Sequence, residues 1–297
     1  MFRHLRRLAM ALAAFALAGA GAAQAQITVG GKNFTEQLLL AEMTTQYLDA
    51  KGFDVTKREG MGSTVLRRAQ LNGQVDLYWE YVGTSLIVYN KVEGGAQMSP
   101  AAAYDKVKDL DAEKGLVWLD PTDANNTYAL AMREQHAEKL GIETLSGLVD
   151  YIDNEEPLSL AVNSEWAGRP DGLPGFQDHY DVRWPRGDVR RMQTGLVYQA
   201  LKEEEVEVGL VFATDGRIAA FDFRVLEDDK NFFPNYAITP VVREDTLEAH
   251  PELREALNTL GATFDDATMQ RLNKMVDVEK KTIENVAQMY LKEQDLI

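Results

Sequence analysis

The alternation of strand and helix signals over residues 26–81 constrains the fold of this chain more than any other feature. Helix-like segments separate three apolar, strand-like runs, at residues 26–30, 53–59 and 75–81. Gly52 and Gly73 end the two intervening helices. This alternation predicts a mostly parallel sheet flanked by helices, and ligands of such sheets bind beyond the carboxyl ends of the strands.

Three turn segments fall at these predicted strand ends, at residues 30–33, 60–64 and 81–84. The backbone N–H groups of such turns can bind an anion where a helix begins. None of the turns contains the G-x-G-x-x-G pattern after a strand or the P-loop pattern, which argues against a nucleotide site. For each turn taken alone, an ordinary helix cap remains the alternative.

The third predicted strand is crowded with aromatic residues. Tyr78, Trp79 and Tyr81 lie within four positions, and the turn to Gly83 and Thr84 follows. Side chains of a strand alternate between its two faces, so only Trp79 and Tyr81 can share one. A core strand with one surface tyrosine and a ligand platform both fit this pattern, and the roles of Tyr78 and Trp79 stay open between packing and pocket shape.

A second α/β region begins near residues 128–132. Further strands are predicted at 158–163 and 206–213, with a helix at 194–205. Residues 166–175 are rich in turn formers and are expected to be irregular. From residue 244 onward, apolar residues recur every three or four positions, which predicts a helical C-terminal part.

The first 25 residues are typical of a secretory signal peptide. Arg3, Arg6 and Arg7 precede an apolar run at residues 8–20, and Ala23-Gln24-Ala25 is a suitable cleavage site. A structural helix is the weaker alternative. The chain contains no cysteine, which excludes disulfides and an N-terminal lipid anchor. We therefore expect cleavage after Ala25 and export to the periplasm as a soluble protein that is not a lipoprotein.

Charge and motif content exclude several functional classes. The formal net charge of −16 makes nucleic acid an unsuitable partner, because phosphate backbones select basic surfaces. His136, His179 and His250 show no metal-ligand spacing, and no G-x-S-x-G motif or cysteine nucleophile occurs. The sequence therefore predicts no enzyme, no cofactor and no metal site, with a periplasmic enzyme as the less favoured alternative.

Four segments together resemble a known family, at residues 31–37, 78–84, 169–174 and 226–230. They are similar to the substrate-binding proteins of ABC importers for glycine betaine, choline and related osmoprotectants. Within this family, the resemblance is to the branch with ProX-like or OpuBC/OpuCC-like binding proteins, which includes the OsmF/YehZ-type proteins. The resemblance covers essentially the whole chain after residue 25 and implies a quaternary ammonium ligand. It also implies a permease and ATPase complex in the inner membrane as partner, and a monomeric protein.

The resemblance implies a type II periplasmic-binding-protein fold. This fold has two α/β lobes with mixed, mostly parallel sheets, joined by two crossovers that close over a ligand. On this chain the crossovers are expected near residues 125–128 and 229–236. Lobe I would comprise residues 26–125 and 236–297, and lobe II residues 126–235.

Carried over position by position, the resemblance implies an aromatic cage and a set of polar contacts. The implied cage residues are Tyr81, Tyr128, Phe212 and Tyr236, and the implied polar contacts are Lys32, Thr84, Asn126 and Arg169. A trimethylammonium group has no N–H donor, so it binds against the negative faces of aromatic rings. A carboxylate at the other end of betaine would bind Arg or Lys.

This chain departs from the family pattern at two positions. Relatives with a four-tyrosine cage have tyrosine where this chain has Phe212, which is a weaker cation partner and could alter specificity. Many relatives have proline or a small apolar residue at the position of Trp79. Ordinary packing is the alternative for the tyrosines and the loop residues, and for Arg169 it is a surface ion pair with Asp171.

A second ligand class is an amino acid, polyamine or other small cation. Such ligands carry N–H donors and need carboxylate or carbonyl acceptors at their cationic end. The implied cage contains no acid, which favours a quaternary ammonium compound. If the side chain of Glu80 pointed into the cleft, it would supply such an acceptor and favour a ligand with N–H donors. The sequence ranks no ligand, gives no affinity and does not separate osmotic protection from nutrient uptake.

Overall fold

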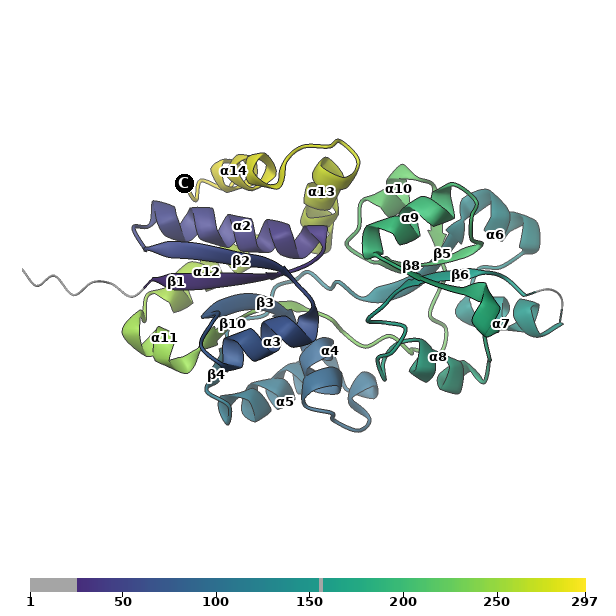
Figure 1. Cartoon of the computed structure of the whole chain (residues 1–297), viewed down its shortest axis with the longest axis horizontal. Helices are drawn as coiled ribbons and strands as arrows, with labels where there is room; N and C mark the ends of the chain where they lie inside the picture. Colours follow the sequence, from purple (N-terminus) through teal and green to yellow (C-terminus); the bar gives the residue numbers. More distant parts are fainter. Residues whose placement is uncertain (1–25, 155–156) are drawn as a thin grey trace, which may run out of the picture.

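The computed structural model describes residues 26–154 and 157–297, and the predicted signal peptide lies outside them. The chain forms two α/β lobes, each built on a five-stranded sheet (Figure 1). We call the lobe that contains the first strand lobe I and the other lobe II. Each sheet mixes parallel and antiparallel pairs, which confirms the predicted fold class.

The sheet of lobe I places the earliest strands beside a late one. Across the sheet its strands are β2 (Val55–Met61), β1 (Ile27–Lys32), β3 (Leu77–Tyr81), β10 (Ile238–Arg243) and β4 (Leu116–Trp118). β1 pairs in parallel with β2 and β3, whereas β10 is antiparallel to β3 and β4. β3 is buried along its whole length, as expected of a central strand covered on both faces.

Helices cover both faces of this sheet (Figure 1). The described helices of lobe I are α2 (Thr35–Ala50), α3 (Ser63–Leu71), α4 (Val82–Thr84), the π-helix η1 (Ser85–Tyr89), the 3-10 helix η2 (Gly95–Gln97), α5 (Pro100–Ala112), α11 (Glu244–Ala249), α12 (Leu253–Gly261), α13 (Asp266–Asp277) and α14 (Ile283–Glu293). The helical C-terminal part predicted from residue 244 is confirmed. Helices α13 and α14 pack against α2.

Lobe II has the same kind of sheet. Across it the strands are β7 (Val189–Met192), β6 (Leu160–Asn163), β8 (Val208–Phe212), β5 (Tyr128–Arg133) and β9 (Phe223–Val225). The described helices of lobe II are α6 (Glu134–Leu140), α7 (Leu145–Asn154), α8 (Leu173–Tyr180), the 3-10 helix η3 (Arg186–Asp188), α9 (Thr194–Lys202) and α10 (Arg217–Ala220).

The expectation of an irregular segment over residues 166–175 is wrong at its end, because α8 begins at Leu173. Pro174 occupies the first turn of this helix, where the missing N–H has no intrahelical partner to lose. Proline therefore starts a helix here, although its place among other turn formers predicted an irregular segment. Residues 166–172 lie outside any helix or strand, as predicted.

The chain passes between the lobes twice, between β4 and β5 and between β9 and β10. The two passages lie side by side, since Asn125 and Ala237 form an antiparallel bridge. The Tyr236 N–H also donates to Asn125 Oδ1 at 2.7 Å. Tyr128 begins β5 immediately after one passage and Tyr236 ends the other, so the connections bring both tyrosines to the boundary between the lobes.

Helix α13 of lobe I also reaches lobe II, where it faces α10 (Figure 1). Gln270 Nε2 donates to the Ala213 carbonyl at 2.8 Å, and Asn273 Nδ2 donates to the Thr214 carbonyl at 2.9 Å. Gly216 allows this approach, because a Cβ there would lie 2.5 Å from the Gln270 carbonyl oxygen. The C-terminal helices therefore help to couple the lobes.

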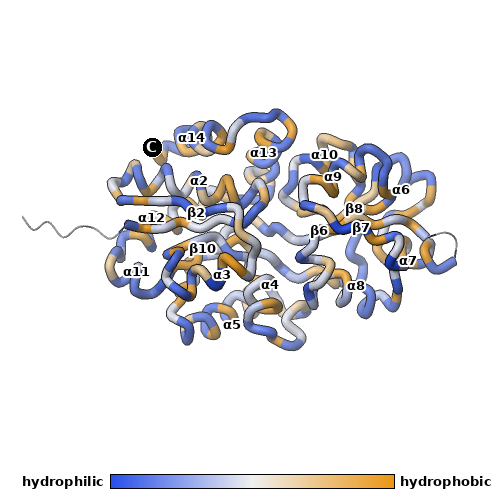
Figure 2. The backbone as a smooth tube through the Cα atoms, viewed as in Figure 1, coloured by the Kyte–Doolittle hydropathy of each residue, from blue (hydrophilic) through white to orange (hydrophobic). Residues whose placement is uncertain are grey.

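Buried apolar residues form one cluster that runs through both lobes, with two smaller clusters in lobe I. Figure 2 shows apolar segments in both lobes, interspersed with hydrophilic ones along the chain. Aromatic rings at the lobe boundary belong to the large cluster, so they connect the two cores. Within residues 26–154 and 157–297, no helix combines the length and the apolarity that a membrane crossing requires.

Candidate functional site

A cleft of about 550 Å³ opens between the lobes. It lies at the carboxyl ends of β1, β6 and β8, where the α/β arrangement places ligands. Both lobes contribute to its lining, which is Asn33, Phe34, Thr35, Leu38, Gly60, Tyr128, Asn163, Ser164, Glu165, Met192, Gln193, Thr194, Gly195, Phe212, Arg217 and Asp277. Three aromatic rings are thus exposed to one cleft, together with polar side chains.

Five aromatic rings form a continuous series across the lobe boundary. Phe34 stacks on Tyr81 with ring centroids 6.2 Å apart, and on Phe212 at 5.4 Å. Phe212 contacts Tyr128 at 4.9 Å, and Tyr128 meets the edge of Tyr236 at 5.3 Å. The structure therefore brings together the four rings of the predicted cage, although they come from distant parts of the sequence, and adds Phe34 as a fifth.

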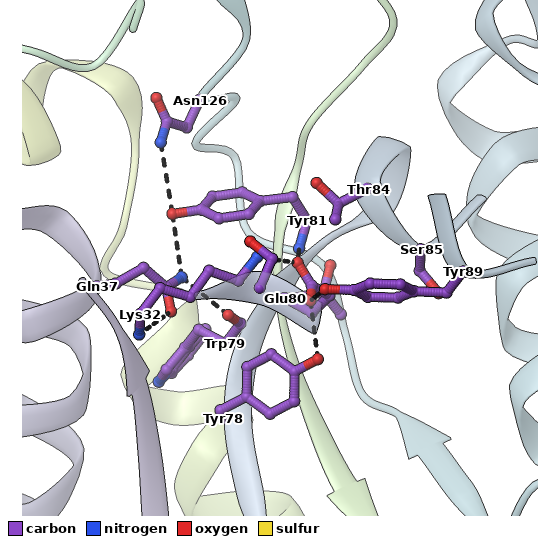
Figure 3. Close-up of polar contacts among 12 residues, drawn as sticks. Lys32, Gln37, Tyr78, Trp79, Glu80, Tyr81, Thr84, Ser85, Tyr89 and Asn126 are labelled. Carbon is purple, nitrogen blue, oxygen red and sulfur yellow. Dashed lines mark hydrogen bonds and ion pairs between the residues drawn. The ribbon is translucent and has the colours of Figure 1, made fainter. Parts of the chain in front are cut away.

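Tyr81 is held from several sides (Figure 3). Its hydroxyl donates to Glu36 Oε1 at 2.8 Å and accepts from Gln37 Nε2 at 3.0 Å. Asn126 Nδ2 lies 3.4 Å from the same hydroxyl, and Lys32 Nζ lies 4.6 Å from the ring centroid. Burial keeps the pKa of Tyr81 well above its usual range, so the hydroxyl stays neutral. The ring is rigidly oriented at the base of the site.

Lys32 forms a buried ion pair with Glu80. The Glu80 carboxylate also accepts from the hydroxyls of Tyr78 at 2.8 Å and Tyr89 at 3.2 Å (Figure 3). Glu80 is fully buried and is absent from the described lining of the cleft. Glu80 neutralises Lys32 inside lobe I and is not in the described lining of the cleft. It therefore gives no support to a ligand with N–H donors.

Tyr78 and Trp79 belong to the core. Trp79 is fully buried, packs edge-on against Phe264 at 5.4 Å, and donates from Nε1 to Thr44 Oγ1 at 2.8 Å. Tyr78 is also fully buried, on the opposite face of β3, with its hydroxyl on Glu80. Both rings stabilise lobe I, and neither lines the cleft.

Arg169 lies in the interior between two cage tyrosines. Its guanidinium carbon is 5.4 Å from the Tyr128 ring centroid and 5.8 Å from that of Tyr236. Arg169 Nε donates to Asp171 Oδ1 at 2.8 Å, and the Tyr236 hydroxyl donates to the same carboxylate. The pair of Arg169 with Asp171 therefore exists, but it is buried, in contrast to the surface ion pair considered above.

Thr84 and Gly83 of lobe I lie against Arg169 and Tyr236, respectively. Arg169 Nη2 lies 3.4 Å from Thr84 Oγ1, across the lobe boundary. A Cβ on Gly83 would lie 2.9 Å from Tyr236 Cε1 and 2.8 Å from the Asn235 carbonyl oxygen. Glycine at this position therefore lets the Tyr236 ring lie directly on the turn that follows β3.

Glu36 joins the two lobes near the rings. Its carboxylate accepts from Tyr81, from Asn126 Nδ2 at 2.7 Å and from the Thr214 hydroxyl of lobe II. Asn273 Nδ2 of α13 lies 3.5 Å away. Burial raises the pKa of Glu36 to about 7, since desolvation outweighs the hydrogen bonds that favour the anion. Glu36 thus changes charge near neutral pH at a contact between the lobes.

Two further contacts join the lobes at the edges of the cleft. Glu165 of lobe II accepts from the Ser63 N–H at 2.9 Å and the Ser63 hydroxyl at 2.8 Å, at the start of α3. Arg217 Nη2 of lobe II lies 3.2 Å from Asp277 Oδ2 at the end of α13. Both acids that line the cleft therefore have partners from the other lobe.

All eight predicted site residues are buried close to the lobe boundary: Tyr81, Tyr128, Phe212, Tyr236, Lys32, Thr84, Asn126 and Arg169. Only Tyr128 and Phe212 of these eight line the cleft. The other six form the layer behind it. Their roles toward a ligand stay predictions.

Phe34, Glu36 and Asp171 are components of the site that were not predicted from the sequence. Each lies in a segment that carried the family resemblance, two to four positions after Lys32 or Arg169. Asp171 follows Arg169 by two positions in a glycine- and proline-rich turn, a spacing at which an ion pair can form. The described residues contain no group of three or more histidine, cysteine, aspartate or glutamate residues able to hold a metal ion.

Comparisons with known proteins agree with this architecture. Residues 25–293 match the family described as the substrate binding domain of ABC-type glycine betaine transport systems. A glycine-betaine-binding protein of Pseudomonas aeruginosa is 47% identical over 303 residues, which cover 100% of this chain and 96% of that protein. The glycine betaine-binding protein YehZ of Escherichia coli is 32% identical and covers 90% of each chain.

A solved structure shows the same two-lobe arrangement. The crystal structure of a glycine betaine/carnitine/choline ABC transporter superposes with a TM-score of 0.71 and 31% identity. The match covers 91% of this chain and 99% of that chain.

Proposed function

The chain belongs to the family of substrate-binding domains of ABC-type glycine betaine transport systems, and from this premise we propose that it captures a quaternary ammonium osmolyte for an importer. Glycine betaine, choline or a close relative would bind in the cleft between the lobes. A ligand that contacts both lobes gains part of its binding free energy only when the lobes are closed. Binding would therefore favour the closed arrangement.

The observation that carries the proposal is the series of aromatic rings at the cleft, with Tyr128 and Phe212 in its lining. A trimethylammonium group gains roughly 0.5 to 2 kcal/mol from each ring face that it contacts away from water. We propose the eight residues selected from the sequence as the ligand site. In this proposal Arg169, with Lys32, Thr84 and Asn126, supplies the polar side.

The acidic side chains in and behind the cleft already have partners within the protein, which supports a quaternary over a primary ammonium ligand. Of the described residues that line the cleft, Glu165 and Asp277 are the acids, and both are engaged across the lobe boundary. Behind the cleft, Glu80 is paired with Lys32. An amino acid or polyamine needs acceptors for its N–H groups, and the acids nearest the cleft are already used as acceptors or ion-pair partners by the protein itself.

The proposal includes a location and partners. We infer export to the periplasm, with cleavage after Ala25, and delivery to a permease and ATPase complex in the inner membrane. Lobe boundaries at residues 26–125 with 236–297, and at 126–235, are proposed with it. In this role the protein binds and releases its ligand unchanged, so it needs no cofactor.

Isothermal titration calorimetry of the purified protein tests the function directly. We expect saturable binding of at least one of glycine betaine, choline, carnitine and proline betaine. Amino acids and polyamines serve as controls of matched size and charge. If none of the four quaternary compounds binds at millimolar concentration while an amino acid does, the proposal is wrong.

A further inference from the structure

We propose that Phe34 is a fifth ring of the cage, which contacts the quaternary ammonium group from lobe I together with Tyr81. This inference rests on the proposed function, since it identifies a contact within the same cleft. It adds a residue that determines specificity to the eight selected above.

Phe34 lies at the cleft between the lobes. Phe34 lies in the short connection between β1 and α2, with an extended backbone (φ −143°, ψ 158°). Its ring is partly buried against the core and lines the cleft. Of the aromatic residues of lobe I that the structure describes, Phe34 is the one in this lining. The segment after β1 therefore places an aromatic ring where a ligand is expected.

The ring of Phe34 is nearly parallel to the rings of Phe212 and Tyr81. The planes of Phe34 and Phe212 differ by 8° with centroids 5.4 Å apart, and the Phe34 and Tyr81 planes differ by 23°. Phe34 thus connects a ring of lobe I with a ring of lobe II. Its orientation depends on both neighbours, which limits the conformational entropy that it would lose when a ligand binds.

Protein cations already contact three of the five rings. Lys32 Nζ lies 4.6 Å from the centroid of Tyr81. The Arg169 guanidinium carbon lies 5.4 Å from the centroid of Tyr128 and 5.8 Å from that of Tyr236. Of the described rings that line the cleft, Phe34 and Phe212 are therefore the two without a competing protein cation.

Phe34, Tyr128 and Phe212 come from the ends of three different strands or connections and face one cleft. Two of them have no hydroxyl, so they offer a π face without a hydrogen-bonding group that would be left unpaired. This suits a trimethylammonium group, which neither donates nor accepts hydrogen bonds. An aliphatic side chain at position 34 would keep the apolar contact and lose the attraction of the cation to the ring.

Calorimetric titration of three variants with choline and with glycine betaine tests the inference. Phe34→Leu removes the ring and retains an apolar side chain, whereas Phe34→Tyr retains the ring. Phe221→Leu is the matched control, because Phe221 is a partly buried phenylalanine of lobe II outside the described lining of the cleft. We expect Phe34→Leu to weaken both ligands by roughly 2- to 30-fold. Phe34→Tyr and Phe221→Leu should bind as the parent protein does.

Thermal unfolding of each variant separates a ligand contact from a structural role. If Phe34→Leu binds both ligands as the parent does, the inference is wrong while the proposed function stands. Equal losses in Phe34→Tyr and Phe34→Leu would also overturn it, because the ring itself would then not matter. If the parent protein binds neither ligand nor the other quaternary compounds, the proposed function falls and this inference with it.

Discussion

The Glu36 carboxylate of lobe I accepts a hydrogen bond from the Thr214 hydroxyl of lobe II, 178 positions away in sequence. Asn126 of the crossover and Tyr81 of the ring series donate to the same carboxylate. One buried acid thus connects helix α2, the crossover, the rings and the second lobe. Its charge state affects all of these contacts together.

The pKa of Glu36 predicts a pH-dependent stability. With a pKa of about 7 when folded and 4.5 ordinarily, the folded protein binds more protons than the unfolded chain between these values. The free energy of unfolding should therefore fall as pH rises through this window, by on the order of 3 kcal/mol, relative to Glu36→Gln. Urea unfolding from pH 5 to 8 measures the difference.

Glu248→Gln is the control for this experiment, because Glu248 is an exposed glutamate of α11. Its pH profile should match that of the parent protein. A parent and a Glu36→Gln variant with parallel profiles would show that the folded state does not hold the Glu36 proton.

Arg169 should distinguish glycine betaine from choline. Removal of the guanidinium in Arg169→Ala takes away a partner for a ligand carboxylate, which choline lacks, so betaine should lose about tenfold more affinity. The change also leaves Asp171 buried without its cation, which should lower the free energy of unfolding by about 3 kcal/mol. Calorimetry and urea unfolding measure the two effects.

The double variant Arg169→Ala with Asp171→Ala separates these effects. It removes both charges, so it should regain much of the stability while betaine binding stays impaired. Equal losses for betaine and choline in both variants would mean that Arg169 supports lobe closure and makes no contact with the carboxylate.

Gly216→Ala should separate the lobes where α10 meets α13. Its φ of −67° suits alanine, so the effect would come from the new Cβ, 2.5 Å from the Gln270 carbonyl oxygen. We expect a loss of about 1 to 3 kcal/mol in the free energy of unfolding and weaker ligand binding. Gly168→Ala is the control, since a Cβ there meets nothing within 4 Å. Identical behaviour of the two variants would contradict the close contact.

Trp79→Phe should reduce stability and leave ligand affinity unchanged. The substitution removes the hydrogen bond from Nε1 to Thr44 and leaves a void beside Phe264. We expect a loss of about 2 kcal/mol in the free energy of unfolding, measured in urea. A change in affinity for choline or betaine larger than about threefold would instead indicate that Trp79 shapes the pocket.

Local patterns predicted much of the fold. The spacing of apolar residues located β1, β2 and β3 to within two residues at each end, and the C-terminal helices appeared where the periodicity indicated. These features depend on neighbours within a few positions, because strand and helix periods are local properties of the backbone. Pro174 was the local exception, since proline both ends and begins regular structure.

The selection of site residues depended on the family resemblance as well as on strand ends. Tyr81, Tyr128, Phe212 and Tyr236 do meet at the lobe boundary, as the cage requires. The alternation of β3 correctly separated Trp79 and Tyr81 from Tyr78. It did not indicate that Trp79 would be core or that Glu80 would pair with Lys32, 48 positions earlier.

The sequence alone therefore determined the alternation of strands and helices in the first part of the chain, the ends of its strands and the surplus of aromatic rings. Only the tertiary structure decided which of these rings face the cleft, that Phe34 stacks on Phe212, and that Lys32 contacts Tyr81 while Arg169 contacts Tyr128 and Tyr236. The reason is physical. Strand periodicity sets the face on which a side chain lies, but its partners come from segments that meet only when two sheets and two crossovers have assembled.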